Sequence, residues 1–161
     1  MRELLRVFAI VSVGICLVPA GAHLFELPNK MSLSPAEYMT IQRIYAGWWL
    51  FGIPIIATLV LTALYTALMR SNRTAFLLSL STLICLAATQ AIFWTFTYPM
   101  NVASNNWTVM PDGFEAARRQ WEYSHAVNAL LTFAAFAAIT LAVLADKRDE
   151  VRAKSTNVVH R

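Results

Sequence analysis

The sequence predicts an all-α integral membrane protein, a four-helix bundle with both termini in the cytoplasm. Of its 161 residues, 58% are hydrophobic and only 14% are charged, whereas an average soluble domain carries about 25% charged residues. Uncharged runs occupy residues 7–22, 44–69, 74–111 and 126–145. Each run can supply the ~20 apolar residues of a spanning helix, the first once it is extended by a turn. These features predict one four-span domain, residues 1–145, and a polar cytoplasmic tail, residues 146–161.

The four helices are expected near residues 4–27, 38–69, 74–98 and 115–145. Pro28 and Pro35 bound the first outer loop, and Ser34 before Pro35 is a favourable helix start. Pro99 and Pro111 bound the second outer loop. The first run also has the composition of a cleaved signal peptide, but cleavage would leave only three spans.

The basic residues predict the orientation. Nine fall on the side of the termini: Arg2, Arg6, Arg70, Arg73, Lys147, Arg148, Arg152, Lys154 and Arg161. Four fall on the other side: Lys30, Arg43, Arg118 and Arg119. Because Lys and Arg in short loops stay on the cytoplasmic side, this count places both termini in the cytoplasm. We expect a multi-pass protein of the bacterial inner membrane. The net charge of +4 then reflects topology and contact with the lipid bilayer, and no nucleic-acid footprint is visible.

Polar and aromatic residues recur at helical spacing on each expected helix. The stripes are His23 and Glu26; Tyr38, Gln42, Tyr45 and Trp49; Gln90, Trp94, Thr97 and Asn101; and Arg118, Glu122, His125 and Asn128. Because successive helices alternate in direction, all four stripes reach the same outer half of the bilayer. They predict one outward-facing polar chamber as the functional site.

Two short motifs bring potential metal ligands to this chamber. His23 and Glu26 form H-x-x-E, and Glu122 and His125 form E-x-x-H, the spacing by which helix bundles present ligands to a shared metal. In antiparallel helices both carboxylates lie about 4.5 Å nearer the surface than the imidazoles. The residues leave four alternatives open: a single zinc, copper or iron ion, a haem between the two histidines, metal-free base catalysis, and a structural ion-pair network.

Three segments carry a resemblance to a known family. They are Pro99-Met100-Asn101, the pattern Arg118-x-x-Trp121-x-x-x-His125-x-x-Asn128, and residues 21–30 at the end of the first helix. On these residues the chain resembles the anthrone-oxygenase-like family of small four-helix integral membrane proteins, many of whose bacterial members have no assigned function. The resemblance implies oxidation of an activated carbon in a polycyclic phenolic by dioxygen, without a dedicated organic cofactor. It makes Asn101, Trp121 and His125 the functional candidates.

We therefore expect a membrane oxidoreductase that acts on a lipophilic small molecule. His125 would be the base, with Glu122 or Glu26 orienting it and Arg118 or Asn101 as the oxyanion partner. The expected substrate-binding residues are Trp94, Trp121, Tyr98, Tyr45 and Gln42. The alternative is a non-enzymatic membrane protein, either an accessory subunit or a binder of a small ligand, metal or haem. Small residues on the helices also allow a homo-oligomer.

Overall fold

The computed structural model describes residues 2–159, which form helices and turns without a strand. The elements are α1 (Arg2–Ser32), α2 (Pro35–Ile41), η1 (Gln42–Tyr45), η2 (Trp48–Phe51), α3 (Gly52–Leu68), α4 (Arg73–Ile92), η3 (Phe93–Thr97), α5 (Tyr98–Ala103) and α6 (Phe114–Val159). Here η1 and η2 are 3-10 turns, and η3 is a π-helical segment. The predicted all-α class is confirmed.

Four helical stretches are long and apolar enough to cross a membrane. They are Glu3–Ser32, Trp48–Leu68, Arg73–Ala103 and Phe114–Ala153. The most apolar window of the last stretch is 39% buried within the protein, against 22% for each of the others. The fourth stretch is therefore the most enclosed, and most of the apolar surface of all four faces outward, as it does in a membrane protein.

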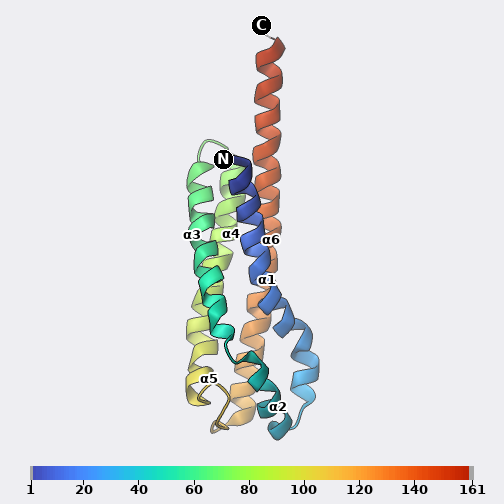
Figure 1. The fold of residues 1–161 in the computed structure, drawn as a ribbon, viewed down its shortest axis with the longest axis vertical. Coiled ribbons are helices and arrows are strands. Elements are labelled where there is room, and N and C mark those ends of the chain that lie inside the picture. The colour runs from blue at the N-terminus through green and yellow to red at the C-terminus, as the bar shows by residue number, and fades with distance from the viewer. Residues whose placement is uncertain (1, 160–161) are drawn as a thin grey trace.

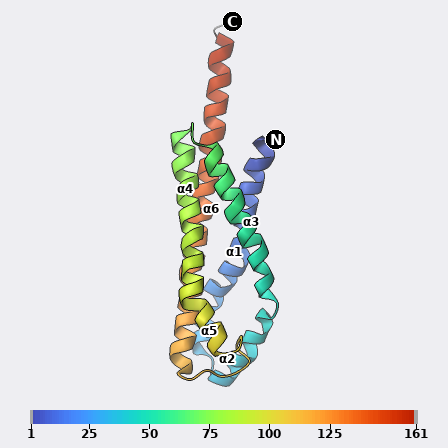
Figure 2. The ribbon, with the colours of Figure 1, turned by 90° about the vertical axis from the view of Figure 1, so that its left-hand side faces the viewer.

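The four long helices lie side by side (Figures 1 and 2). Helix α1 packs against α3 and α6, and α4 packs against the same two helices. The N-terminus and the turn between α3 and α4 lie at one end, which we call the terminal end (Figure 1). Helices α2 and α5 lie at the opposite end, which we call the loop end (Figure 1). The C-terminal part of α6 projects beyond the other helices at the terminal end.

Small side chains allow close contact between the helices. Ala9 and Val13 of α1 lie in one buried cluster with Ala135 and Ile139 of α6. Buried threonines accompany this cluster, and the hydroxyls of Thr58, Thr66 and Thr82 donate to carbonyls of the preceding turn. Thr82, for example, donates to Leu78 and to Ala135 across the interface between α4 and α6, at 3.1 and 3.3 Å. Bonds of this kind satisfy a buried hydroxyl within an apolar interior.

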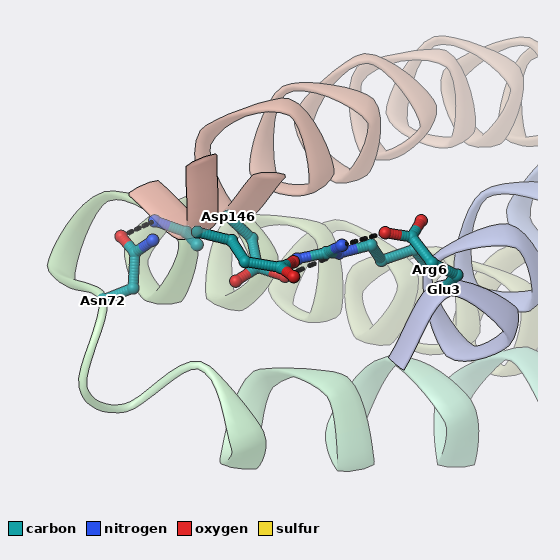
Figure 3. A network of polar contacts seen from close by, with 6 residues as sticks. Glu3, Arg6, Asn72 and Asp146 are labelled. Carbon is teal, nitrogen blue, oxygen red and sulfur yellow. Dashed lines mark hydrogen bonds and ion pairs between the residues drawn. The ribbon is translucent and has the colours of Figure 1, made fainter. Parts of the chain in front are cut away.

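A second contact at the terminal end joins α1 to α6. The guanidinium of Arg6 is buried and donates to Asp146, Glu150 and Glu3 over 2.8, 2.8 and 2.6 Å (Figure 3). Charged groups are buried only when they are paired. These ion pairs hold α6 against α1 through the first turns of the segment that the sequence assigned to a polar tail. The segment is helical as far as Val159.

The second expected helix, residues 38–69, is broken in the structure. Gly47 has a φ of 86°, a left-handed conformation that glycine adopts readily, and it separates η1 from η2. Gln42 and Tyr45 therefore lie in a different segment from Trp49, which is exposed. The expected continuous stripe is wrong beyond Tyr45.

The other expected helices begin or end elsewhere. Helix α1 runs through Pro28 to Ser32, so the first loop starts five residues later than expected. The third helix passes through η3 into α5, and the Tyr98 N–H bonds to the Phe93 carbonyl. Pro99 lacks an N–H for the normal helical bond, which accounts for the local widening.

Candidate functional site

Two histidines meet at the loop end of the protein. The rings of His23 on α1 and His125 on α6 stack with centroids 4.0 Å apart and planes 28° apart. His23 is buried and His125 is partly buried. The pair lies within two of the candidate membrane spans.

Aromatic rings surround this pair. The Trp121 ring lies 4.2 Å from the His125 ring and 5.1 Å from the His23 ring. Tyr45 and Trp48 approach His23 at 4.6 and 5.5 Å. The site is therefore a packed cage whose walls come from the broken second helix and from α6.

A buried ion pair lies beside the cage. Lys30 Nζ is 2.6 Å from Glu122 Oε1, and the two side chains are 4% and 0% exposed. The Tyr38 hydroxyl donates to the same Glu122 oxygen over 2.8 Å. Lys30 also donates to the Tyr45 hydroxyl over 3.2 Å, and that hydroxyl donates to Glu26. The Lys30 ammonium thus contacts the Glu122 carboxylate directly and is linked to the Glu26 carboxylate through the Tyr45 hydroxyl.

A first helix that ends before Pro28, as the sequence predicts, leaves Lys30 outside the expected site. The helix continues past the proline, so His23, Glu26 and Lys30 fall on one face at i, i+3 and i+7. The Lys30 ammonium lies 4.6 Å from the Trp121 ring centroid and 4.7 Å from that of Tyr45. Cations in this position are attracted to aromatic faces. The i, i+3, i+7 spacing is present in the sequence, but a helix that ends before Pro28 does not include Lys30.

Two tyrosines of the network, Tyr38 and Tyr45, lie outside the candidate membrane spans. Burial raises the pKa of Tyr38, and the neighbouring Glu122 carboxylate raises it further. Burial and the Glu26 carboxylate likewise raise the pKa of Tyr45. Both hydroxyls therefore remain protonated and act as hydrogen-bond donors to the carboxylates.

The three residues singled out by the family resemblance form one chain of contacts. Trp121 Nε1 donates to Asn101 Oδ1 over 2.7 Å, and the indole contacts the His125 ring. Asn101 lies on α5 and the other two lie on α6. The hydrogen bond fixes the indole against the imidazole.

Arg118 lies at the rim of the site and makes other contacts. It donates to the Leu33 carbonyl over 2.8 Å and pairs with Glu115 at 2.6 Å. Its guanidinium lies over the rings of Phe114 and Tyr38. The cation beside the Trp121 ring is Lys30, so the place expected for Arg118 is taken by a lysine from another helix.

Two of the expected substrate-binding residues lie away from the cage. Trp94 and Tyr98 pack on each other at 4.9 Å and are 59% and 44% exposed on the outer surface of η3 and α5. Gln42 is buried beside Tyr38. Of the five expected residues, Tyr45 and Trp121 line the cage. Trp48, which is not among the five, also lines it.

The structure divides the four expected metal ligands. The imidazoles of His23 and His125 stack on each other, whereas Glu26 and Glu122 bond to tyrosines and Lys30. Among the described residues, no group of three or more His, Cys, Asp or Glu side chains is placed to hold a metal ion. A haem needs its two axial nitrogens to face each other across the macrocycle. Face-to-face contact between the rings leaves no space for it, so these residues do not fit a haem in this arrangement.

Several buried polar atoms in this region have no hydrogen-bond partner within the described part of the chain. They are found on three helical segments and include His23 Nδ1, Glu122 Oε2 and Asn128 Oδ1. A buried unsatisfied polar group costs about 1–3 kcal/mol. Such groups call for an explanation, and binding of a ligand or of water is one.

Comparison of the chain with protein-family models, with curated proteins and with solved structures found no match. The fold and the site define an all-helical protein with four candidate membrane spans and a buried His, Lys and Glu cluster. The resemblance to the anthrone-oxygenase-like family rests on the quoted sequence segments.

Proposed function

We propose that the protein is an oxygenase-like membrane enzyme, resident in the bacterial inner membrane, that oxidises a lipophilic polycyclic phenol at His125. The observation that carries the proposal is the stacked pair of His23 and His125 within an aromatic cage, next to the buried Lys30–Glu122 ion pair. A base, a cation and aromatic walls are the groups that this reaction requires.

The cage supports recognition of a flat apolar substrate. Trp121, Tyr45 and Trp48 provide ring surfaces at 4.2–5.5 Å from the imidazoles. Rings held by packing and by the Asn101 bond lose little freedom when a ligand stacks on them.

In the proposed reaction His125 removes a proton from a CH₂ group between two aromatic rings. The carbanion is delocalised onto a phenolic oxygen, where the Lys30 ammonium stabilises the negative charge. The carbanion gives one electron to O₂, and the resulting radical and superoxide combine into a C–O–O⁻ group. That group takes the proton back from the imidazolium, and loss of water leaves C=O. The balance is CH₂ + O₂ → C=O + H₂O, with O₂ as the oxidant.

Lys30 takes the role that the sequence analysis gave to Arg118 or Asn101. Its ammonium is held beside the Trp121 and Tyr45 rings by Glu122. Asn101 instead positions Trp121 through the indole N–H. Glu122 and Glu26 therefore act on the cation and the tyrosine hydroxyl, and neither bonds to an imidazole among the described residues.

The test is oxygen consumption by purified protein in nanodiscs with anthrone as the substrate. We expect His125→Ala to lose turnover while circular dichroism shows an unchanged helix content. His160→Ala, a histidine outside the described residues, is the matched control and should keep full activity. Turnover by His125→Ala at the wild-type rate would refute the proposal. Loss of stability alone, without an activity in the wild type, would support a structural ion-pair network in a non-enzymatic membrane protein.

Metal content belongs to the same experiment. Elemental analysis and an optical spectrum of wild type and of a variant lacking both site histidines report any bound metal or haem. A stoichiometric metal that disappears in the variant would replace metal-free base catalysis by a metal-assisted reaction.

A further inference from the structure

Trp107 fills an aromatic seat at the loop end, in the segment between α5 and α6. The seat is formed by Tyr38, Phe114 and Trp121, whose ring centroids lie 5.2, 6.5 and 5.7 Å from that of Trp107. Trp107 is only 4% exposed. Since Trp121 contacts His125, the Trp107 indole is one ring away from the proposed base.

Trp107 occupies this seat in an unfavourable backbone conformation. Asn105, Asn106 and Trp107 have φ values of 47°, 54° and 61°. Asparagine tolerates this left-handed region, but a bulky residue adopts it at a cost. The indole Nε1 is also buried without an acceptor in the described part of the chain. Ring packing therefore holds Trp107 in place although its backbone conformation is unfavourable and its indole N–H has no acceptor in the described part of the chain.

The segment around Trp107 is tied to itself. The backbone N–H groups of residues 105–109 bond only to residues 101–105 among the described residues, and that of Trp107 donates to Ser104 Oγ over 2.9 Å. Breaking the ring contacts thus releases the segment without breaking a hydrogen bond to another helix. Segments with few such ties open locally.

We infer that Trp107 is a displaceable plug, and that a planar polycyclic phenol enters the site from the loop end by taking its place. The ligand class rests on the proposed function. An aromatic ligand in the seat would contact Tyr38 and Trp121. It would lie beside Lys30, whose ammonium is 5.6 and 4.6 Å from those two ring centroids. Displacement relieves the left-handed strain and lets the indole N–H reach water.

The first experiment measures association of 1,8-dihydroxyanthraquinone, a planar phenol without the oxidisable CH₂, by stopped-flow absorbance in nanodiscs. Trp107→Ala empties the seat, and we expect association about tenfold faster, because the ring packing that opposes displacement no longer contributes to the barrier. Trp49→Ala, which truncates an exposed tryptophan, is the matched control and should bind at the wild-type rate. Equal rates in Trp107→Ala and wild type would overturn the plug.

A second variant covers the case in which Trp107→Ala does not fold. Asn106→Val puts a β-branched residue at a φ of 54° and leaves every ring of the seat intact, so it should also speed association. An unchanged rate in this variant would count against the plug.

Hydrogen exchange tests the plug without any ligand. Residues 104–110 should exchange faster than the buried part of α1 in the wild type. Exchange as slow as that of α1 would overturn the plug and leave the proposed function standing. Absence of ligand binding in wild type and Trp107→Ala alike would overturn the proposed function and the ligand named here.

Discussion

Replacing Lys30 with methionine tests the buried ion pair most directly. The change keeps the length and apolar stem of the side chain but leaves the Glu122 carboxylate, which is 0% exposed, without its cation. At the observed separation of 2.6 Å, Coulomb attraction at an effective dielectric constant of ~20 is about 6 kcal/mol. Desolvation offsets part of this, and breaking a buried pair by removing one partner costs about 3–5 kcal/mol. We expect Lys30→Met to lower the free energy of unfolding by that amount.

The assay is reversible unfolding in mixed micelles, followed by far-UV circular dichroism. Lys147→Met makes the same substitution at an exposed lysine of α6 and should change stability by less than about 0.5 kcal/mol. The double variant Lys30→Met with Glu122→Gln removes both charges, so it should be more stable than the sum of the single effects predicts, by about 2 kcal/mol or more. Additive single effects, or a loss below about 1 kcal/mol for Lys30→Met, would refute the reasoning.

Three further predictions concern the rest of the structure. Arg6→Met should lower the free energy of unfolding by about 3 kcal/mol, because it removes the guanidinium that pairs with the buried Asp146 and the partly buried Glu150 on α6; the same unfolding assay measures it. Tyr38 and Tyr45 have raised pKa values, so an alkaline titration at 295 nm should find both protonated at about pH 11, above the usual tyrosine pKa of about 10. Asn101→Ala removes the acceptor of the Trp121 indole and should cost about 1 kcal/mol and slow turnover, both measured on the purified variant.

Each of these has a control and an opposing outcome. Arg70→Met changes an exposed arginine at the same end and should leave stability unchanged; an equal loss in both variants would deny the Arg6 cluster a special role. For the tyrosines, raised pKa values mean that the unfolded state releases protons first, so stability falls as the pH rises above about 10. Ionisation of all tyrosines near pH 10 in folded protein would contradict the burial. Asn101→Asp keeps an acceptor for the indole, and its failure to retain stability better than Asn101→Ala would refute the role of that bond.

Much of the fold could be predicted because the driving pattern is local. Long uncharged runs identify the four candidate spans, and their order along the chain requires neighbours that alternate in direction. The same counting places His23 and His125 at one level of the bundle, near the loop ends of their helices, but it does not predict that their rings stack. The predicted helix end was wrong at Pro28, because the helix continues through this helix-breaking residue.

The contacts inside the site could not be predicted from spacing. Helical periodicity places Glu26, Glu122 and the histidines on facing stripes, but it does not say which donor reaches which acceptor. Which pairs form depends on angstrom-scale differences in helix position. In the structure, Glu122 pairs with Lys30 and accepts a hydrogen bond from Tyr38. The break at Gly47 turned Trp48 toward the site and Trp49 away from it.

The sequence by itself determined the helical class, the candidate spans and the presence of histidines and carboxylates near one end, because hydrophobic runs and residue periodicity are properties of the chain alone. The tertiary structure decided that the histidines stack, that Lys30 is the buried cation and that Trp107 covers Trp121. These are relations between segments far apart in the chain, fixed by packing and by the need to pair every buried charge.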